Sequence, residues 1–407
     1  EEQAVMSQNN PTIQSIVDDS SIESYFNKIP IDFSPKFSLT LPIRLLINLQ
    51  NNSLNTNWLN KYLGTDMVQN PSIKTELIKS IPSSGISSSL FVNSGILDMT
   101  YLNYGLSLFN INAYSSMKIP KELTKIIFDG VRFNEVQNIS NFDSKGYIFN
   151  ETTFSIGKKL NLKQLPFTTY LGFGIRYLTG LFSYTESYEG SLATKEDSVI
   201  IFSDMKIAFT DSNQIASGFG FDLGAYGQIN EKTSIQFSLI GIGSYLKSKQ
   251  ASVWRGINKI NLSNSDITEI LDYNDTQMDS INKTFLVSDT INFINNLSIM
   301  LPAQLNVAAS YYYSSNVHIK GAMKFITQTS FIGKIPPQIS LGLELFPKKR
   351  YSWLGGFSFG GINKINFGLG LELKVKNFCF NIAGGQSGGI FNSAKGFKFS
   401  SEFRLSF

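Results

Sequence analysis

The sequence GFKFSSEFRLSF, residues 396–407, alternates apolar and polar side chains and is the stretch that decides the fold. Successive side chains of a β-strand point to opposite faces, so the alternation predicts a strand with one apolar and one polar face. Strands of soluble sandwiches show the same pattern, so this stretch alone does not place the chain in a membrane. The apolar positions, interrupted only at Ser401, are Phe397, Phe399, Phe403, Leu405 and Phe407.

The composition favours a membrane barrel over a soluble protein. Only 16% of the 407 residues are charged, whereas 13% are aromatic, among them 33 Phe. No run reaches the roughly 18 consecutive apolar residues that a membrane helix requires. A chain that is aromatic-rich, charge-poor and strand-periodic is typical of outer-membrane β-barrels. The net charge of +4 is small and dispersed, so we expect no nucleic-acid partner.

The same alternation recurs along the chain. Residues 37–50 form the first predicted strand, and the last third of the chain reads as a run of hairpins. Further strands are predicted at residues 86–93, 101–117, 147–157, 166–184, 218–225, 233–246, 303–313, 317–329, 338–346, 351–360, 364–376 and 378–385.

The lengths of the links predict the number of strands. Outer-membrane barrels keep short turns at the periplasmic end and long loops outside. Counts from the two ends of the chain agree only if the strand-like residues 198–209 are not a full membrane strand. We therefore predict an all-β, single transmembrane antiparallel barrel of about 14 strands over residues 36–407. We assign residues 185–217 and residues 254–302 as extracellular excursions. The first contains the strand-like residues 198–209, as a hairpin above the membrane.

Residues 1–35 are polar, and we interpret them as a periplasmic lead-in or plug, with a disordered tail as the open alternative. The start at Glu1 suits a mature form whose signal peptide has been removed. Short helices are predicted at residues 22–28, 58–63, 121–129, 267–271 and 291–297.

The end of the sequence resembles the assembly signal of outer-membrane barrels, an alternating strand that finishes in an aromatic residue. On this resemblance Phe403, Leu405 and Phe407 are the candidate signal residues. The location that it implies is the cell outer membrane.

The chain as a whole resembles the FadL-type outer-membrane barrels. The likeness is closest to the branch common in Bacteroidota that includes the PorV-like proteins and barrels of unassigned function. It rests on the strand count, on the lead-in, and on residues 170–180, 218–225 and 301–305. FadL-type plugs often carry Asn-Pro-Ala, whereas this sequence has Asn-Pro-Thr at residues 10–12.

We find no constellation that predicts catalysis or a cofactor. His318 is the only histidine, and we interpret it as a structural residue of the lumen. Cys379 is the only cysteine, and the acidic stretch from Asp272 to Asp279 lacks the order of a calcium loop, so no metal site is expected. Glycines such as those of residues 218–227 more often permit tight curvature, or close approach by a plug or partner, than they bind phosphate.

Five charged residues share the inward register on strands that barrel closure should bring near one another. Buried charges require partners, so we predict that they form a ladder of ion pairs in the lumen. These residues are Arg44, Glu372, Lys374, Glu402 and Arg404.

Two functions follow from the resemblance, neither of them enzymatic. The first is an accessory or scaffold subunit of an outer-membrane assembly or secretion complex, with other outer-membrane or periplasmic proteins as partners. The alternative is a FadL-like uptake channel for hydrophobic small molecules, with such a molecule as its ligand. Outer-membrane lipid surrounds the barrel in both.

Overall fold

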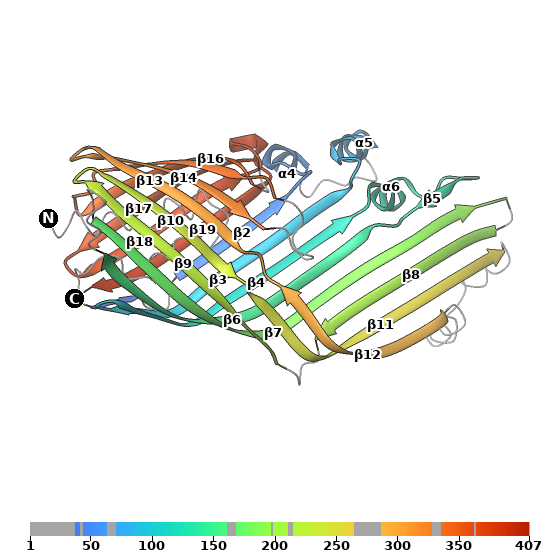
Figure 1. Ribbon diagram of the computed structural model, residues 1–407. Helices are drawn as coiled ribbons and strands as arrows, with labels where there is room; N and C mark the ends of the chain where they lie inside the picture. Colours follow the sequence, from blue (N-terminus) through green and yellow to red (C-terminus); the bar gives the residue numbers. More distant parts are fainter. Residues whose placement is uncertain are drawn as a thin grey trace.

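The computed structural model describes residues 37–40, 44–62, 71–160, 168–196, 198–210, 215–263, 286–327, 335–361 and 364–406. The predicted lead-in at residues 1–35, the predicted helix at 267–271, the acidic stretch and Phe407 lie outside these ranges. Nearly all described residues belong to one antiparallel sheet, which curls into a barrel (Figure 1).

Fourteen strands pair antiparallel in sequence order, and the last pairs with the first to close a ring. They are β2 (Arg44–Asn51), β3 (Ile86–Tyr101), β4 (Tyr104–Ile119), β6 (Phe142–Leu160), β7 (Thr168–Thr194), β9 (Ala216–Asn230), β10 (Thr233–Ile242), β13 (Gln304–Ser314), β14 (Val317–Ile326), β15 (Gln338–Leu345), β16 (Tyr351–Gly360), β17 (Ile365–Val375), β18 (Phe378–Ser387) and β19 (Gly396–Ser406).

Three further strands continue the sheet beyond the ring. They are β8 (Ser198–Thr210), β11 (Tyr245–Ser263) and β12 (Leu286–Met300). The outer half of β7, residues 184–194, pairs with β8, β8 pairs with β11, and β11 pairs with β12. We call this four-stranded extension the projecting sheet, and Figure 1 shows it reaching far past one side of the barrel. The prediction of an all-β antiparallel barrel of about 14 strands is confirmed.

The alternation of side chains explains why the ring forms. On β15, Ile339, Leu341 and Leu343 are exposed on the outward face, whereas Gln338 and Glu344 are buried on the inward face. Strand β15 thus presents an apolar face to its surroundings and a polar face to the interior. An outward apolar belt of this kind is stable against lipid and unstable against water.

The two ends of the ring differ in their links. Links of two residues at 102–103, 231–232, 315–316 and 376–377 lie at one end, the short-turn end. The opposite end, the long-loop end, carries α4 (Thr56–Tyr62), α5 (Pro71–Ser80), α6 (Lys121–Asp129) and the 3-10 helix η1 (Phe391–Ser393). The first two helices pack through a buried cluster of Trp58, Ile73, Leu77 and Ile81. No helix in the described part of the chain is both long and apolar enough to cross a membrane.

Two short strands pair outside the regular order. Strand β1 (Phe37–Thr40) pairs with β3 and with the end of β19, and β5 (Val136–Asn138) pairs with β7 near its outer tip.

The structure confirms the predicted helix at residues 121–129 and corrects the one at 291–297. The latter residues lie within β12 and pair with β11 from Trp254↔Ile291 to Ser248↔Leu297. Their apolar spacing fits a helix locally, but the ladder of hydrogen bonds to β11 overrides that local preference. Residues 198–209 form β8 of the projecting sheet. The predicted ring leaves them out, because the strand counts from the two ends of the chain agree only without them.

Candidate functional site

The inner wall of the ring is the candidate site. An eight-stranded barrel is filled by the side chains of its own wall, and the diameter grows with the number of strands. A ring of fourteen strands is therefore wide enough for its interior to hold a solute or a filling segment. Most buried charged and amide side chains of the ring face inward; they include Asn93, Asn110, Asn112, Glu151, Asp222, His318, Glu344, Glu372, Asn381 and Glu402.

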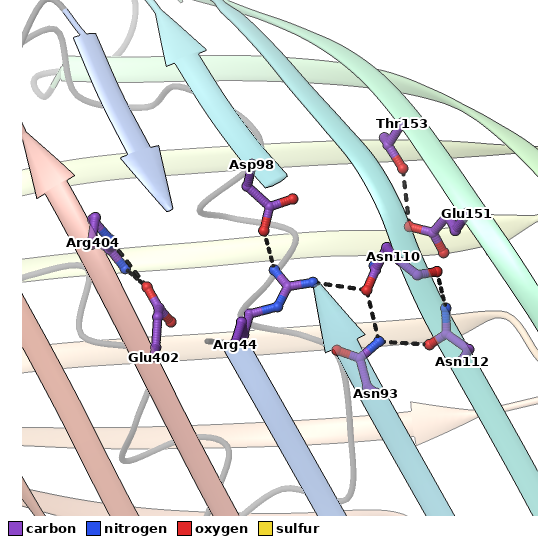
Figure 2. Close-up of polar contacts among 9 residues, drawn as sticks. All are labelled: Arg44, Asn93, Asp98, Asn110, Asn112, Glu151, Thr153, Glu402 and Arg404. Carbon is purple, nitrogen blue, oxygen red and sulfur yellow. Dashed lines mark hydrogen bonds and ion pairs between the residues drawn. The ribbon is translucent and has the colours of Figure 1, made fainter. Parts of the chain in front are cut away.

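A network of one arginine, one aspartate and three asparagines joins β2, β3 and β4 (Figure 2). Arg44 donates from Nη1 to Asp98 Oδ2 at 2.7 Å and from Nη2 to Asn110 Oδ1 at 3.0 Å. Asn93 donates from Nδ2 to the Oδ1 atoms of Asn110 and Asn112, at 3.0 and 2.7 Å. The network satisfies amide groups that would be costly to bury alone, so it stiffens this part of the wall.

Four of the five residues of the predicted charge ladder form two local pairs in the structure. Glu402 accepts a hydrogen bond from Arg404 Nε at 3.1 Å on the same strand, and Lys374 Nζ lies 2.6 Å from Glu372 Oε2 on β17. Arg44 lies apart from the Glu402–Arg404 pair and binds Asp98 on β3 and Asn110 on β4 instead (Figure 2). Residues two apart on a strand share a face, so a charge finds its nearest partner on its own strand before it finds one across the seam.

His318 lies fully buried near the short-turn end. Its Nδ1 atom is 3.1 Å from Glu344 Oε2, Lys320 Nζ is 3.7 Å from the same oxygen, and the imidazole stacks on the Tyr312 ring at 4.0 Å. The contacts with Glu344 and with the Tyr312 side chain thus hold the histidine within the barrel wall. Across the described ranges, no group of three or more His, Cys, Asp or Glu side chains is arranged to hold a metal ion.

A second charged set, which sequence reasoning missed, joins β6, β7 and β9. Arg176 Nη2 lies 3.3 Å from Glu151 Oε2, and Arg176 Nε lies 2.9 Å from Asp222 Oδ2. Asp222 Oδ1 also accepts a hydrogen bond from the Gly241 backbone N–H at 2.6 Å. The sequence contains a signal for this set. Arg176 is the only charged residue of the glycine-rich strand segment 170–180, and Asp222 is the only one of segment 218–225.

The glycines of β9 allow the link between β10 and β11 to lie directly on that strand. A Cβ atom on Gly218 would fall 1.5 Å from the Tyr245 carbonyl oxygen, and one on Gly220 would fall 2.0 Å from Ser244 Oγ. The backbone contact excludes a side chain at Gly218, and a side chain at Gly220 would require Ser244 to move. The glycine-rich segment therefore serves a close approach, by residues 244–245 of the chain itself and not by the plug or partner that the sequence suggested.

An apolar cluster interrupts the polar inner wall where the projecting sheet leaves the ring. Its members are 7% exposed or less: Tyr147, Phe149, Leu178, Ala216, Leu246, Ile299 and Leu301. Tyr147 and Phe149 alternate with the exposed Ile148 and share the register of the buried Glu151, so they face inward.

The candidate assembly-signal residues lie along β19. Phe403 packs on Phe378 of β18, with ring centroids 5.6 Å apart, and Leu405 pairs with Leu39 of β1. Phe407 lies outside the described residues. Their role in assembly stays a prediction.

Similar structures are barrels of FadL type. A TodX mutant, described as a monoaromatic hydrocarbon channel, matches with a TM-score of 0.50 at 8% identity, over 97% of this chain and 98% of that one. The Pseudomonas putida toluene transporter TodX matches with a TM-score of 0.42 at 9% identity, over 98% and 92% of the two chains. A Pseudomonas aeruginosa FadL homologue matches with a TM-score of 0.43 at 9% identity, over 97% and 96%. At these identities the likeness concerns the fold alone.

A search of curated proteins finds no match. One family model does match, and it covers residues 33–384, which is most of the chain. The protein therefore belongs to the family described as "Family of unknown function (DUF5723)".

Proposed function

We propose that the protein is an outer-membrane channel of FadL-like fold that admits small hydrophobic molecules. Sequence analysis placed this function second, behind the accessory subunit. The fold likeness favours it, because a structure similar over nearly the whole of both chains is described as a monoaromatic hydrocarbon channel. The accessory-subunit role and the PorV-like, Bacteroidota-type affinity gain no such support, and we do not adopt them.

The observation that carries the proposal is the inward apolar cluster. Burial of apolar surface is favourable by roughly 25 cal/mol per Å², so a hydrophobic solute gains free energy at an apolar wall and not at an ion-paired one. Leu178 and Phe149 belong to this cluster beside the paired Arg176, and at 0% and 7% exposure they would meet a hydrocarbon only where the cluster parts. The polar groups there are engaged with one another, so a passing hydrocarbon would not have to desolvate them.

The outer surface supports the location in the outer membrane. Leu341, Leu369 and Phe154 are each at least half exposed and face outward, as lipid-facing residues of such barrels do.

The test compares uptake of a radiolabelled monoaromatic hydrocarbon by cells that do or do not express the protein in the outer membrane. Wild-type protein should raise uptake severalfold. Leu178→Asn, which puts an amide into the apolar cluster, should lower that uptake, whereas the volume-conserving Leu178→Met should preserve it. Heat-modifiability on gels checks that each variant is folded. Uptake equal to that of cells without the protein, or equal in both variants, would refute the proposal.

A further inference from the structure

The exposed charges at the short-turn end of the barrel are nearly all positive. Among the described residues of this end, seven exposed side chains are cationic and only Glu231 is anionic. The cations are Lys158, Lys159, Lys232, Lys348, Lys349, Arg350 and Lys376. This end therefore carries a formal charge of +6, whereas the whole chain carries +4. The fold thus gathers at one end of the barrel cations that are dispersed along the sequence.

Four of these cations lie on two neighbouring turns, which we call the cationic turns: Lys348, Lys349, Arg350 and Lys376. The first three belong to the link between β15 and β16, and the fourth belongs to the link between β17 and β18. The two links are adjacent, because the Lys374 N–H of β17 donates to the Arg350 carbonyl oxygen at 2.7 Å. Within the described part of the chain, none of the four side chains takes part in an ion pair. The nearby carboxylate of Glu372 is buried and paired with Lys374.

The backbone of the first turn is held in place by three hydrogen bonds. The Phe346 N–H donates to the Asn316 carbonyl oxygen at 2.8 Å, and the Lys349 N–H donates to the Phe346 carbonyl oxygen at 3.0 Å. The Lys374 ammonium group donates to the Pro347 carbonyl oxygen at 3.0 Å. The turn thus holds like charges close together, and like charges repel one another. A bound anion relieves that repulsion, and because the turn is already ordered, binding does not have to order it.

Outward-facing aromatic residues adjoin the cationic turns. Tyr351 and Trp353 of β16 are 46% and 55% exposed, and Phe378 of β18 is 49% exposed. Ser352, between the first two, is buried, so Tyr351 and Trp353 share the outward face. The aromatic girdles of outer-membrane barrels lie where the hydrocarbon of the bilayer meets the headgroups. The cationic turns lie directly beyond this girdle and therefore at the level of the lipid headgroups.

We propose that the cationic turns bind the phosphate group of anionic phospholipids in the leaflet that surrounds the short-turn end. Arg350 can donate two hydrogen bonds to one phosphate, and the lysine ammonium groups add positive charge. A basic residue near an anionic membrane surface strengthens binding about fivefold. Lipid is a better partner than an acidic protein, because the outward wall already keeps headgroups beside the turns. The inference goes beyond the channel function and rests only on the lipid-facing wall.

The test measures which lipid lies beside Trp353. The chain has three tryptophans, so Trp58→Phe and Trp254→Phe leave Trp353 as the only one. This full-length parent is reconstituted in phosphatidylcholine vesicles that contain increasing fractions of bromine-labelled phosphatidylglycerol or bromine-labelled phosphatidylcholine. Bromine quenches tryptophan fluorescence on contact. The anionic lipid should reach half-quenching at a mole fraction about fivefold lower than the neutral lipid, and high salt should reduce this preference because it screens the charges.

Variants of the cationic turns locate the preference. Replacing Lys348, Lys349 and Arg350 together by Gln should make the two lipids quench Trp353 equally. Lys376→Gln, a single change in the other turn, should lower the preference in part. Heat-modifiability on gels checks that each variant is folded.

A matched control separates the cationic turns from the charge of the whole end. Replacing Lys158, Lys159 and Lys232 together by Gln removes the same charge from the same end of the barrel but leaves the cationic turns intact. This control should keep the preference for the anionic lipid at Trp353.

Other results would overturn the proposal. These are equal quenching by the two lipids in the parent, a preference that survives in the triple variant of the cationic turns, and a preference that the control loses. A preference abolished by inorganic phosphate at matched ionic strength would assign the turns to free phosphate and overturn the lipid assignment. Absence of quenching by either lipid would overturn the proposal together with the lipid-facing wall. Hydrocarbon uptake does not enter the measurement, so failure of the channel proposal is distinguished from failure of this one.

Discussion

Arg176 of β7 and Asp222 of β9 form an ion pair inside the barrel wall, with Nε and Oδ2 2.9 Å apart and the aspartate side chain fully buried. Because Asp222 Oδ1 also accepts the Gly241 N–H, the pair anchors the point where β10 ends and the chain turns toward β11. The projecting sheet thus begins at a charged brace, with the apolar cluster packed beside it.

Replacing Asp222 by Asn should destabilise the barrel. The amide keeps an oxygen for Gly241 but removes the charge that neutralises Arg176, and breaking a buried ion pair typically costs about 3–5 kcal/mol. Since Glu151 still pairs with Arg176, we expect a value near the lower end. Urea titration of folded protein in detergent, read by heat-modifiability, measures the change. Phe219→Leu, on the outward face of the same strand, is the control and should change little; equal losses would contradict the brace.

Arg44→Lys should weaken the network of Figure 2 although the charge is kept. The guanidinium reaches Asp98 and Asn110 with two nitrogens at once, and an ammonium cannot reproduce that fork. We expect a loss of roughly 1.5–3 kcal/mol, the scale of one hydrogen bond to a charged group. The same urea titration measures it. A stability equal to wild type would show that the fork contributes nothing.

Leu369→Arg should cost roughly 2–4 kcal/mol if the outward face meets lipid near the middle of the bilayer. Leu369 is 57% exposed and its neighbour Gly370 takes the opposite register. Gly370→Ser should therefore cost much less. Refolding equilibria in phospholipid vesicles compare the two, and equal costs would mean that the faces are misassigned.

Deleting Phe407 should reduce the amount of folded protein in the outer membrane. The residue completes the alternation of Phe403 and Leu405, which resembles a barrel assembly signal. The measurement is the heat-modifiable fraction in outer-membrane preparations, with Ser406→Ala as a neighbouring control. An unchanged amount of folded protein after the deletion would contradict a role of Phe407 in assembly.

Acid should loosen the projecting sheet. The hydrogen bond from Arg255 lowers the pKa of Asp204 below its ordinary value, through contact of Arg255 Nε with Asp204 Oδ1 at 2.9 Å. A depressed carboxyl pKa stabilises the folded state above the unfolded value of about 3.9, and that stability is lost as pH falls through the folded pKa. The protection factors of the β8 and β11 amides, which correct for the pH dependence of intrinsic hydrogen exchange, should therefore fall below about pH 4 in wild type. Asp204→Asn should show a smaller fall, and an identical pH profile would exclude the ion pair as the cause.

The sequence by itself determined the barrel. A period of two with one apolar face, as in residues 396–407, leaves few ways to bury or expose that face, and the lengths of the links fixed the number of strands to within a few. The helix at residues 121–129 was also predictable, because Pro120 precedes it and Gly130 follows it.

The tertiary structure decided the pairing of charges and the shape beyond the ring. Register places Glu402 and Arg44 on the same inner wall, but only the packed structure shows that Arg404 and Asp98 are their nearer partners. Likewise Ile291 and Leu297 have helical spacing, and only the hydrogen bonds from β11 make them a strand. Periodicity tells which face a side chain takes, whereas its partner depends on contacts between residues far apart in the sequence, and these exist only once the sheet has closed.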